Sequence, residues 1–367
     1  MALNKSLNGI IRQSYSKTFL AVNFGCRVNA AETNQFSELL IKKGFTPSNN
    51  KKESRGVGLV FINTCSVTAK ANIESLGQIR SLRQKHPSAF IVVTGCAKID
   101  SLQNLPNTLF LTNRQKLSLL KAHRSSYTPQ IGDKFSRTNR FILKIQDGCN
   151  HYCTYCVVPY KRKVLWSLPV SKAVKTVKQA IADGYQEIII SGINLNLYRP
   201  GLSSLLEALL TQTSIPKISF GSIPLNCFDD KFINLISNYR SRFAGYLHIP
   251  LQSGSDKILK LMHRPYTRKN VIDIFNKIKC ISPFPQRGTK GDLLLATDII
   301  VGFPGETDSD FQDTYDLCQQ IGFSKIHVFR FSPRPGTQAK HLFDQNPTPK
   351  SVLKLRSEKI KSLENLL

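Results

Sequence analysis

The amino-acid sequence predicts an α/β protein in which an N-terminal parallel-sheet α/β domain is followed by a partial (β/α)6 barrel. Two observations predict this class. Short apolar strands alternate with helical stretches along the chain, and a polar segment with Pro and Gly at residues 124–139 divides them into two series. With 367 residues, the chain is long enough for two domains that each bury a core.

The first series predicts a parallel sheet, because strands separated by helices pair as βαβ units. Its expected strands are 18–25, 58–63, 89–94 and 108–112, and its expected helices are 30–43 and 67–85. We therefore expect an N-terminal domain over residues 18–124 and a linker over 125–138.

The second series has six strand-and-helix repeats, which fit a full or partial parallel barrel. Its expected strands are 141–145, 187–191, 217–220, 246–249, 295–301 and 325–330, with helices such as 171–182 and 308–321. We expect the barrel over residues 139–340 and a C-terminal helical tail over 341–367. Active-site groups of such a barrel belong at the C-terminal ends of its strands.

The charge balance favours a polyanionic partner. Lys and Arg total 51 against 24 for Asp and Glu, a formal net charge of +27. A basic surface neutralises phosphates, so nucleic acid is favoured over a merely soluble surface, although charge does not separate RNA from DNA. No apolar run approaches the roughly 18–20 residues that span a bilayer, and we expect no membrane partner and a cytoplasmic location.

The nine cysteines predict metal ligation in a reducing compartment. Cys149, Cys153 and Cys156 follow the first barrel strand, and their spacing lets one loop wrap three thiolates around a metal centre. Such thiolates hold iron–sulfur clusters, and three of them leave one iron open. A structural zinc site is the alternative, but it needs a fourth ligand, and His151 is poorly spaced to supply it.

Three more cysteines each follow a strand of the N-terminal series: Cys26, Cys65 and Cys96. In a parallel sheet these positions meet at one edge, outside the carboxyl ends of the strands. We interpret them as ligands of a second cluster; the alternative is three unrelated buried cysteines.

The cysteine loop resembles that of the radical S-adenosylmethionine superfamily, and the whole pattern resembles the methylthiotransferase family from about residue 18 to 365. The segments that carry this resemblance are INTCSVT (62–68), VVPYKRK (157–163), EIIISGINLNLY (187–198), HIPLQSGSD (248–256), MHRPYTR (262–268), TDIIVGFPGET (297–307) and FSPRPGT (331–337). Within the family, GCRVN at 25–29 resembles the tRNA N6-threonylcarbamoyladenosine methylthiotransferase (MtaB-like) branch.

The resemblance implies two [4Fe-4S] clusters and S-adenosyl-L-methionine as cofactors. It implies a methylthio group added to C2 of the modified adenosine in the tRNA anticodon stem-loop, with an electron donor such as flavodoxin or ferredoxin. By the same resemblance, S-adenosylmethionine contacts are expected at Tyr155, Gly192, His248 and Gln252, although Gly192 could be a turn glycine and His248 a core histidine.

Three departures from the family pattern keep alternatives open. Segment 161–169 lacks a glycine and an arginine usual in the family, and Ile223 stands where an acidic residue is common. We also expect the family's small C-terminal β-barrel RNA-binding domain to be absent. A non-catalytic iron–sulfur or RNA-binding relative, or the same chemistry on another adenosine or on a protein, therefore remains an alternative.

Overall fold

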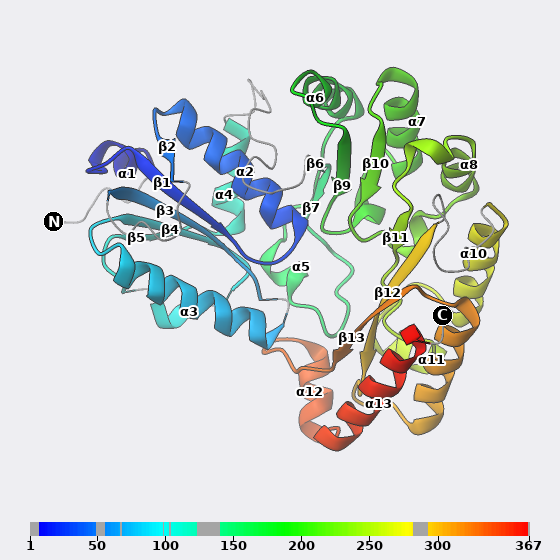
Figure 1. The fold of residues 1–367 in the computed structure, drawn as a ribbon. Helices are drawn as coiled ribbons and strands as arrows, with labels where there is room; N and C mark the ends of the chain where they lie inside the picture. The colour runs from blue at the N-terminus through cyan, green and yellow to red at the C-terminus, as the bar shows by residue number, and fades with distance from the viewer. Residues whose placement is uncertain are drawn as a thin grey trace. The chain divides into compact units, whose positions relative to one another are not determined.

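The computed structural model describes residues 7–48, 56–66, 68–97, 99–102, 104–122, 140–281 and 293–365. The chain forms two compact units, Met1–Ile142 and Leu143–Leu367 (Figure 1). The expected linker over residues 125–138 lies outside the described residues.

The first unit is built on a five-stranded parallel sheet with the order β2-β1-β3-β4-β5. Its elements are α1 (Leu7–Gln13), β1 (Thr18–Asn23), α2 (Arg27–Lys42), β2 (Thr46–Pro47), β3 (Val57–Thr64), α3 (Ala69–Lys85), β4 (Phe90–Gly95), β5 (Thr108–Phe110) and α4 (Asn113–Ala122). The expected parallel sheet is confirmed, whereas α1, the short β2 and α4 were not expected.

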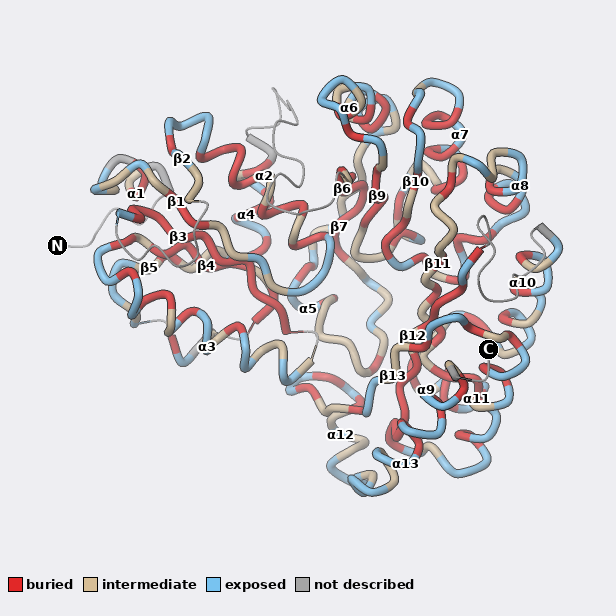
Figure 2. Tube along the Cα trace, viewed as in Figure 1, coloured by how far each residue is buried: buried red, intermediate tan, exposed pale blue. Residues whose placement is uncertain are grey.

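The central strand β3 explains why helices cover both faces of this sheet. All its residues are buried (Figure 2), and alternate side chains of a strand point to opposite faces. Leu59 and Phe61 join a core cluster with Phe36 of α2, while Val60 and Ile62 join another with Ile79 of α3. One apolar layer thus packs on each face of the sheet, and together the two layers fix the carboxyl edge where the cysteines lie.

The second unit is a partial barrel made of two three-stranded sheets. Their orders are β10-β9-β6 and β11-β12-β13, and parallel bridges from Ile218 to Phe243 and from Ser222 to His248 join β10 to the β11 region. The strands are β6 (Arg140–Lys144), β9 (Glu187–Ser191), β10 (Lys217–Phe220), β11 (Tyr246–His248), β12 (Leu294–Val301) and β13 (Lys325–Arg330). Their spatial order follows the chain, so the barrel predicted from six repeats is confirmed.

Helices and one small hairpin complete the second unit. The helices are α5 (Val158–Lys161), α6 (Val170–Ala182), α7 (Leu202–Gln212), α8 (Asp230–Asn238), α9 (Asp256–Leu261), α10 (Arg268–Ile281), α11 (Asp308–Ile321), α12 (Gln338–Gln345) and α13 (Lys350–Ser362), and the hairpin pairs β7 (Gln146–Asp147) with β8 (Trp166–Ser167). Helix α11 has the expected bounds because local signals define both ends. Thr307 and Asp310 form a capping box at its start, and Gly322 with φ of 72° ends it.

Candidate active site

A buried ion network anchors the cysteine loop of residues 149–156. The carboxylate of Asp147 accepts hydrogen bonds from Lys144 Nζ at 2.6 Å and from Arg162 Nη1 at 2.9 Å, and each of these side chains is at most 1% exposed. Buried charges persist when they are paired and hydrogen-bonded in this way. Gly148 follows with φ of +81°, and a Cβ there would lie 2.3 Å from the carbonyl oxygen of Val164. The loop therefore leaves the barrel along a path that only glycine fits.

The three thiols of this loop face hydrogen-bond donors. All three cysteines are free and half-buried. Asn194 Nδ2 donates to Cys149 Sγ at 3.7 Å, Arg264 Nη1 donates to Cys153 Sγ at 3.6 Å, and the Val158 amide donates to Cys156 Sγ at 3.4 Å. Hydrogen-bond donors that face the ligand sulfurs are part of the usual surroundings of an iron–sulfur cluster. The donor set therefore fits an iron–sulfur cluster.

The spacing of the sulfurs bears on the zinc alternative. Among the described residues, His248, Asp298 and His327 are the one group of three potential ligands whose donor atoms lie within 4.8 Å of one another, and neither cysteine trio forms such a group. Thiolates around a single zinc with bonds of about 2.3 Å would lie about 3.8 Å apart. Neither trio therefore has its three sulfurs as close together as a single zinc ion would require.

The cysteines of the first unit follow three neighbouring strands. Cys26 comes after β1, Cys65 after β3 and Cys96 after β4, and these strands lie side by side in the order β1-β3-β4. The Cys96 amide donates to the Thr64 carbonyl at 3.1 Å. This bond joins the end of β4 to the end of β3, so both strands end at the same edge of the sheet. Because the carboxyl ends of parallel strands meet at one edge, the sheet brings the three cysteines to that edge, as the sequence predicted.

Gly25 brings the turn before Cys26 against Cys65. Its φ is +93°, and a Cβ at this position would lie 2.6 Å from Cys65 Sγ. Any side chain here would meet the sulfur as well as straining the backbone. Cys65 and Cys96 are buried, and Cys26 is exposed. The turn therefore brings the backbone just before Cys26 into close contact with Cys65.

A polar network lies in the core beneath this edge, and sequence reasoning missed it. Lys116 Nζ of α4 lies 2.5 Å from Glu32 Oε2 of α2, and both side chains are fully buried. Asn63 of β3 joins them, since its Oδ1 accepts from Lys116 Nζ at 3.5 Å and its Nδ2 donates to the Asn29 carbonyl at 3.0 Å. The network ties two helices to the strand that ends just before Cys65.

Three of the four residues expected to contact S-adenosylmethionine have well-defined surroundings in the structure. A Cβ on Gly192 would lie 2.8 Å from Leu195 Cδ2, the end of a flexible side chain, so the packing leaves room for glycine and disfavours larger residues. Gln252 has φ of +75° and is held by backbone bonds to β12; strained backbone of this kind gathers at functional sites. Tyr155 packs against the apolar cluster that contains Met262, and burial raises the pKa of its phenol. Their roles toward the cofactor stay predictions.

His248 belongs to a polar cluster that the sequence did not predict. Its Nε2 lies 2.8 Å from Asp298 Oδ1, and its Nδ1 lies 2.9 Å from Ser222 Oγ. His327 stands directly opposite Asp298 in the register of β12 and β13. Both ring nitrogens of His248 thus have partners, as a core histidine would, and its contact with S-adenosylmethionine stays a prediction. A charged residue inside the apolar strand 295–301 was the signal for Asp298.

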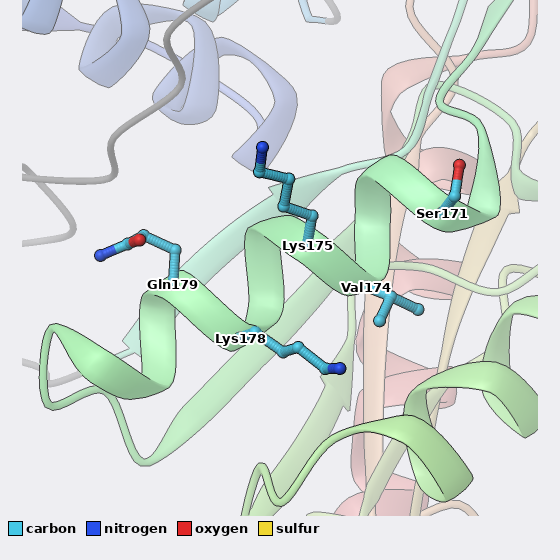
Figure 3. Close-up of a pocket in the computed structure, with 5 residues that line it drawn as sticks. All are labelled: Ser171, Val174, Lys175, Lys178 and Gln179. Atoms are coloured by element: carbon cyan, nitrogen blue, oxygen red, sulfur yellow. The ribbon is translucent and has the colours of Figure 1, made fainter.

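A cavity of about 460 Å³ lies along α6, and basic side chains flank it. Its lining residues are Ser171, Val174, Lys175, Lys178 and Gln179 (Figure 3). The helix contains no Asp or Glu, and Lys175 and Lys178 are exposed. This face of α6 could therefore receive a phosphate group.

Comparisons with known proteins agree with this architecture. The family model described as the radical SAM superfamily matches residues 143–318, and the model described as uncharacterized protein family UPF0004 matches residues 18–111. A radical S-adenosylmethionine methyltransferase from Kitasatospora setae, TsrM, has a similar fold, with a TM-score of 0.64 at 13% identity over 89% of this chain and 77% of its own. None of the described helices is both long and apolar enough to cross a bilayer. Fold and cysteine loop together define a radical S-adenosylmethionine enzyme.

Comparison with sequence relatives identifies the family within this class of enzymes. The chain is 33% identical over 370 residues to the threonylcarbamoyladenosine tRNA methylthiotransferase MtaB of Thermotoga maritima, covering 94% of this chain and 81% of the relative. It is 34% identical over 346 residues to the MtaB of Chlamydia pneumoniae, covering 92% and 79%. A tRNA-2-methylthio-N(6)-dimethylallyladenosine synthase of Moorella thermoacetica is 31% identical over 95% of this chain and 83% of the relative. The chain belongs to the radical S-adenosylmethionine methylthiotransferase family and resembles its MtaB-like branch. Enzymes of this class use an iron–sulfur cluster and S-adenosylmethionine.

Proposed function

We propose that this enzyme adds a methylthio group to C2 of N6-threonylcarbamoyladenosine next to the anticodon of tRNA. One observation carries the proposal: the chain has two separate thiol trios, one in the loop after the first barrel strand and one at the carboxyl edge of the N-terminal sheet. A radical enzyme that only cleaves S-adenosylmethionine needs the first trio, and the second is available for sulfur insertion.

In this proposal, Cys149, Cys153 and Cys156 hold one [4Fe-4S] cluster and leave one iron open for S-adenosylmethionine. Cys26, Cys65 and Cys96 hold a second cluster. When bound, these groups supply one-electron cleavage of the sulfonium and the transferred sulfur. The chain contributes the donors that face the loop thiols and the turn at Gly25 that lies against Cys65.

We assign the contacts with S-adenosylmethionine to Tyr155, Gly192, His248 and Gln252. Gly192 and Gln252 follow β9 and β11, where a barrel carries its active-site groups. Residues 18–124 form the cluster-bearing N-terminal domain and residues 139–340 the barrel in this proposal, with a helical tail after them.

The proposed substrate region is the anticodon stem-loop, as the names of the MtaB relatives suggest. The net charge of +27 and the acid-free helix α6 support a polyanionic partner. The proposed electron donor is a small redox protein such as flavodoxin or ferredoxin, and the proposed location is the cytoplasm.

The two trios are tested separately by Cys153→Ala and Cys65→Ala, with Cys280→Ala as an exposed-cysteine control. Each chain is loaded with iron and sulfide without oxygen, then incubated with a reductant, S-adenosylmethionine and tRNA. We expect no 5′-deoxyadenosine from the Cys153 variant. We expect 5′-deoxyadenosine but no methylthio product from the Cys65 variant, and both from the Cys280 control. Methylthio product from the Cys65 variant would contradict the role of the second trio, and no 5′-deoxyadenosine from the unchanged chain would favour a non-catalytic relative.

A further inference from the structure

The end of helix α9 docks on the cysteine loop. Thr154, inside the loop, donates through its amide to the Met262 carbonyl at 3.3 Å and through Oγ1 to the Leu261 carbonyl at 2.8 Å. These two carbonyls belong to the last turn of a helix, where oxygens lack partners within the helix. The loop therefore satisfies the end of α9, and each fixes the position of the other.

A left-handed residue then turns the chain back toward the cysteines. His263 has φ of +55°, and the amide of Arg264 donates to the Leu259 carbonyl at 2.9 Å. A left-handed residue followed by such a bond is a common way to end a helix, usually with glycine in that place. This conformation is uncommon for residues other than glycine, although histidine adopts it more often than most residues do. The turn places Arg264 beside Cys153.

Three hydrogen bonds fix the Arg264 guanidinium. Its Nη1 donates to Cys153 Sγ at 3.6 Å, its Nη2 to the Pro250 carbonyl at 3.2 Å, and its Nε to Tyr266 Oη at 2.9 Å. The side chain is half-buried, and within the described ranges no carboxylate forms an ion pair with it. A partly buried cation needs a nearby anion. Cys153 Sγ is the loop sulfur that Arg264 contacts, and a cysteine sulfur carries negative charge when it holds a metal.

We propose that Arg264 is a positioning residue that raises the reduction potential of the cluster held by Cys149, Cys153 and Cys156. When an external one-electron reductant reduces the cluster, the cluster gains one negative charge. A fixed cation that donates a hydrogen bond to a ligand sulfur stabilises that added charge, and hydrogen bonds to sulfur are known determinants of cluster potential. The inference rests on the cluster part of the proposed function and is independent of the tRNA substrate.

The test is a redox titration of the reconstituted full-length chain, followed by electron paramagnetic resonance without S-adenosylmethionine. The signal of the barrel cluster is the one that Cys153→Ala abolishes. The variants are Arg264→Gln, which removes the charge, and Arg264→Lys, which keeps the charge without the guanidinium fork. Lys260→Gln, at an exposed position in α9, is the control for loss of one positive charge.

We expect Arg264→Gln to lower the equilibrium constant for cluster reduction at least tenfold, which is about 59 mV for one electron. Arg264→Lys should lie between this variant and the unchanged chain, and Lys260→Gln should match the unchanged chain. Equal potentials for Arg264→Gln and the unchanged chain at equal iron content would overturn the proposal, as would an equal shift in Lys260→Gln. If Arg264→Gln fails to bind iron, an unchanged potential in Arg264→Lys overturns it. A shift that arises only after S-adenosylmethionine is added would also overturn it and would assign Arg264 to the cofactor carboxylate instead.

Discussion

Replacing Lys116 by Met should destabilise the N-terminal unit strongly. The change removes the ammonium group that lies 2.5 Å from the fully buried Glu32 carboxylate, together with its bond to Asn63. Breaking a buried ion pair by removing one partner costs about 3–5 kcal/mol. Domains have unfolding free energies of about 5–15 kcal/mol, so this loss is a large fraction of the total. With a urea m-value of about 2 kcal/mol/M, the unfolding midpoint of this unit should fall by about 2 M.

The single tryptophan lets this effect be assigned to one unit. Trp166 lies in the second unit, so its fluorescence follows the barrel, whereas far-UV circular dichroism follows both units. We expect Lys116→Met to move a transition seen by circular dichroism and to leave the Trp166 transition in place. The control is Lys70→Met, which breaks an exposed i,i+4 pair with Glu74 in the same unit and should leave both transitions unchanged.

A double variant tests the electrostatic reason directly. Glu32→Gln combined with Lys116→Met removes both charges, so it should recover part of the stability that Lys116→Met loses. The reasoning would be refuted if Lys116→Met unfolded at the same urea concentration as the unchanged chain. It would also be refuted if the double variant were no more stable than the single one.

Three further predictions concern the proposed second cluster, the basic helix and the barrel. Gly25→Ala should lower the iron content of the reconstituted chain by about half, because its Cβ would meet the sulfur of Cys65, a proposed ligand. Gly44→Ala, with φ of +82° but no atom within 4 Å of its Cβ, should retain full iron in the same colorimetric assay. Lys175→Gln and Lys178→Gln should each weaken tRNA binding and reduce the salt dependence of log Kd by about one, measured by filter binding at several salt concentrations; unchanged slopes would exclude this face. Burial alone would raise the pKa of Asp310. Hydrogen bonds from a lysine and two hydroxyl side chains outweigh burial and hold this pKa below its ordinary value. The barrel should therefore lose stability as the pH falls below about 4, and Asp310→Asn should lose less between pH 5 and pH 3 in thermal unfolding; an equal loss would contradict this cause.

Local patterns were sufficient to predict most of the fold. Strands β9, β10 and β13 have the expected bounds, because each is a short segment between helical patterns that contains two or more apolar residues of strand-forming type. The positions of both cysteine trios at strand ends were also predictable. A strand followed by a cysteine can be recognised from local sequence, and parallel strands end at one edge of a sheet.

Contacts between distant residues were not predictable in this way. The hairpin of β7 and β8 has two residues in each strand, and its formation depends on the buried pairing of Asp147 with Arg162. The contact between Arg264 and Cys153 joins residues 111 positions apart, and the turn before it has His263 in a left-handed conformation that is uncommon for any residue except glycine. The partners of His248 come from neighbouring strands whose register is known only once the barrel has formed.

The most direct test of the proposed function is mass spectrometry of tRNA nucleosides from cells with and without this gene. We expect 2-methylthio-N6-threonylcarbamoyladenosine in the presence of the gene. In its absence, and in cells that carry only the Cys65→Ala variant, we expect the unmethylthiolated N6-threonylcarbamoyladenosine alone. Equal amounts of the methylthio nucleoside in all three strains would contradict the account.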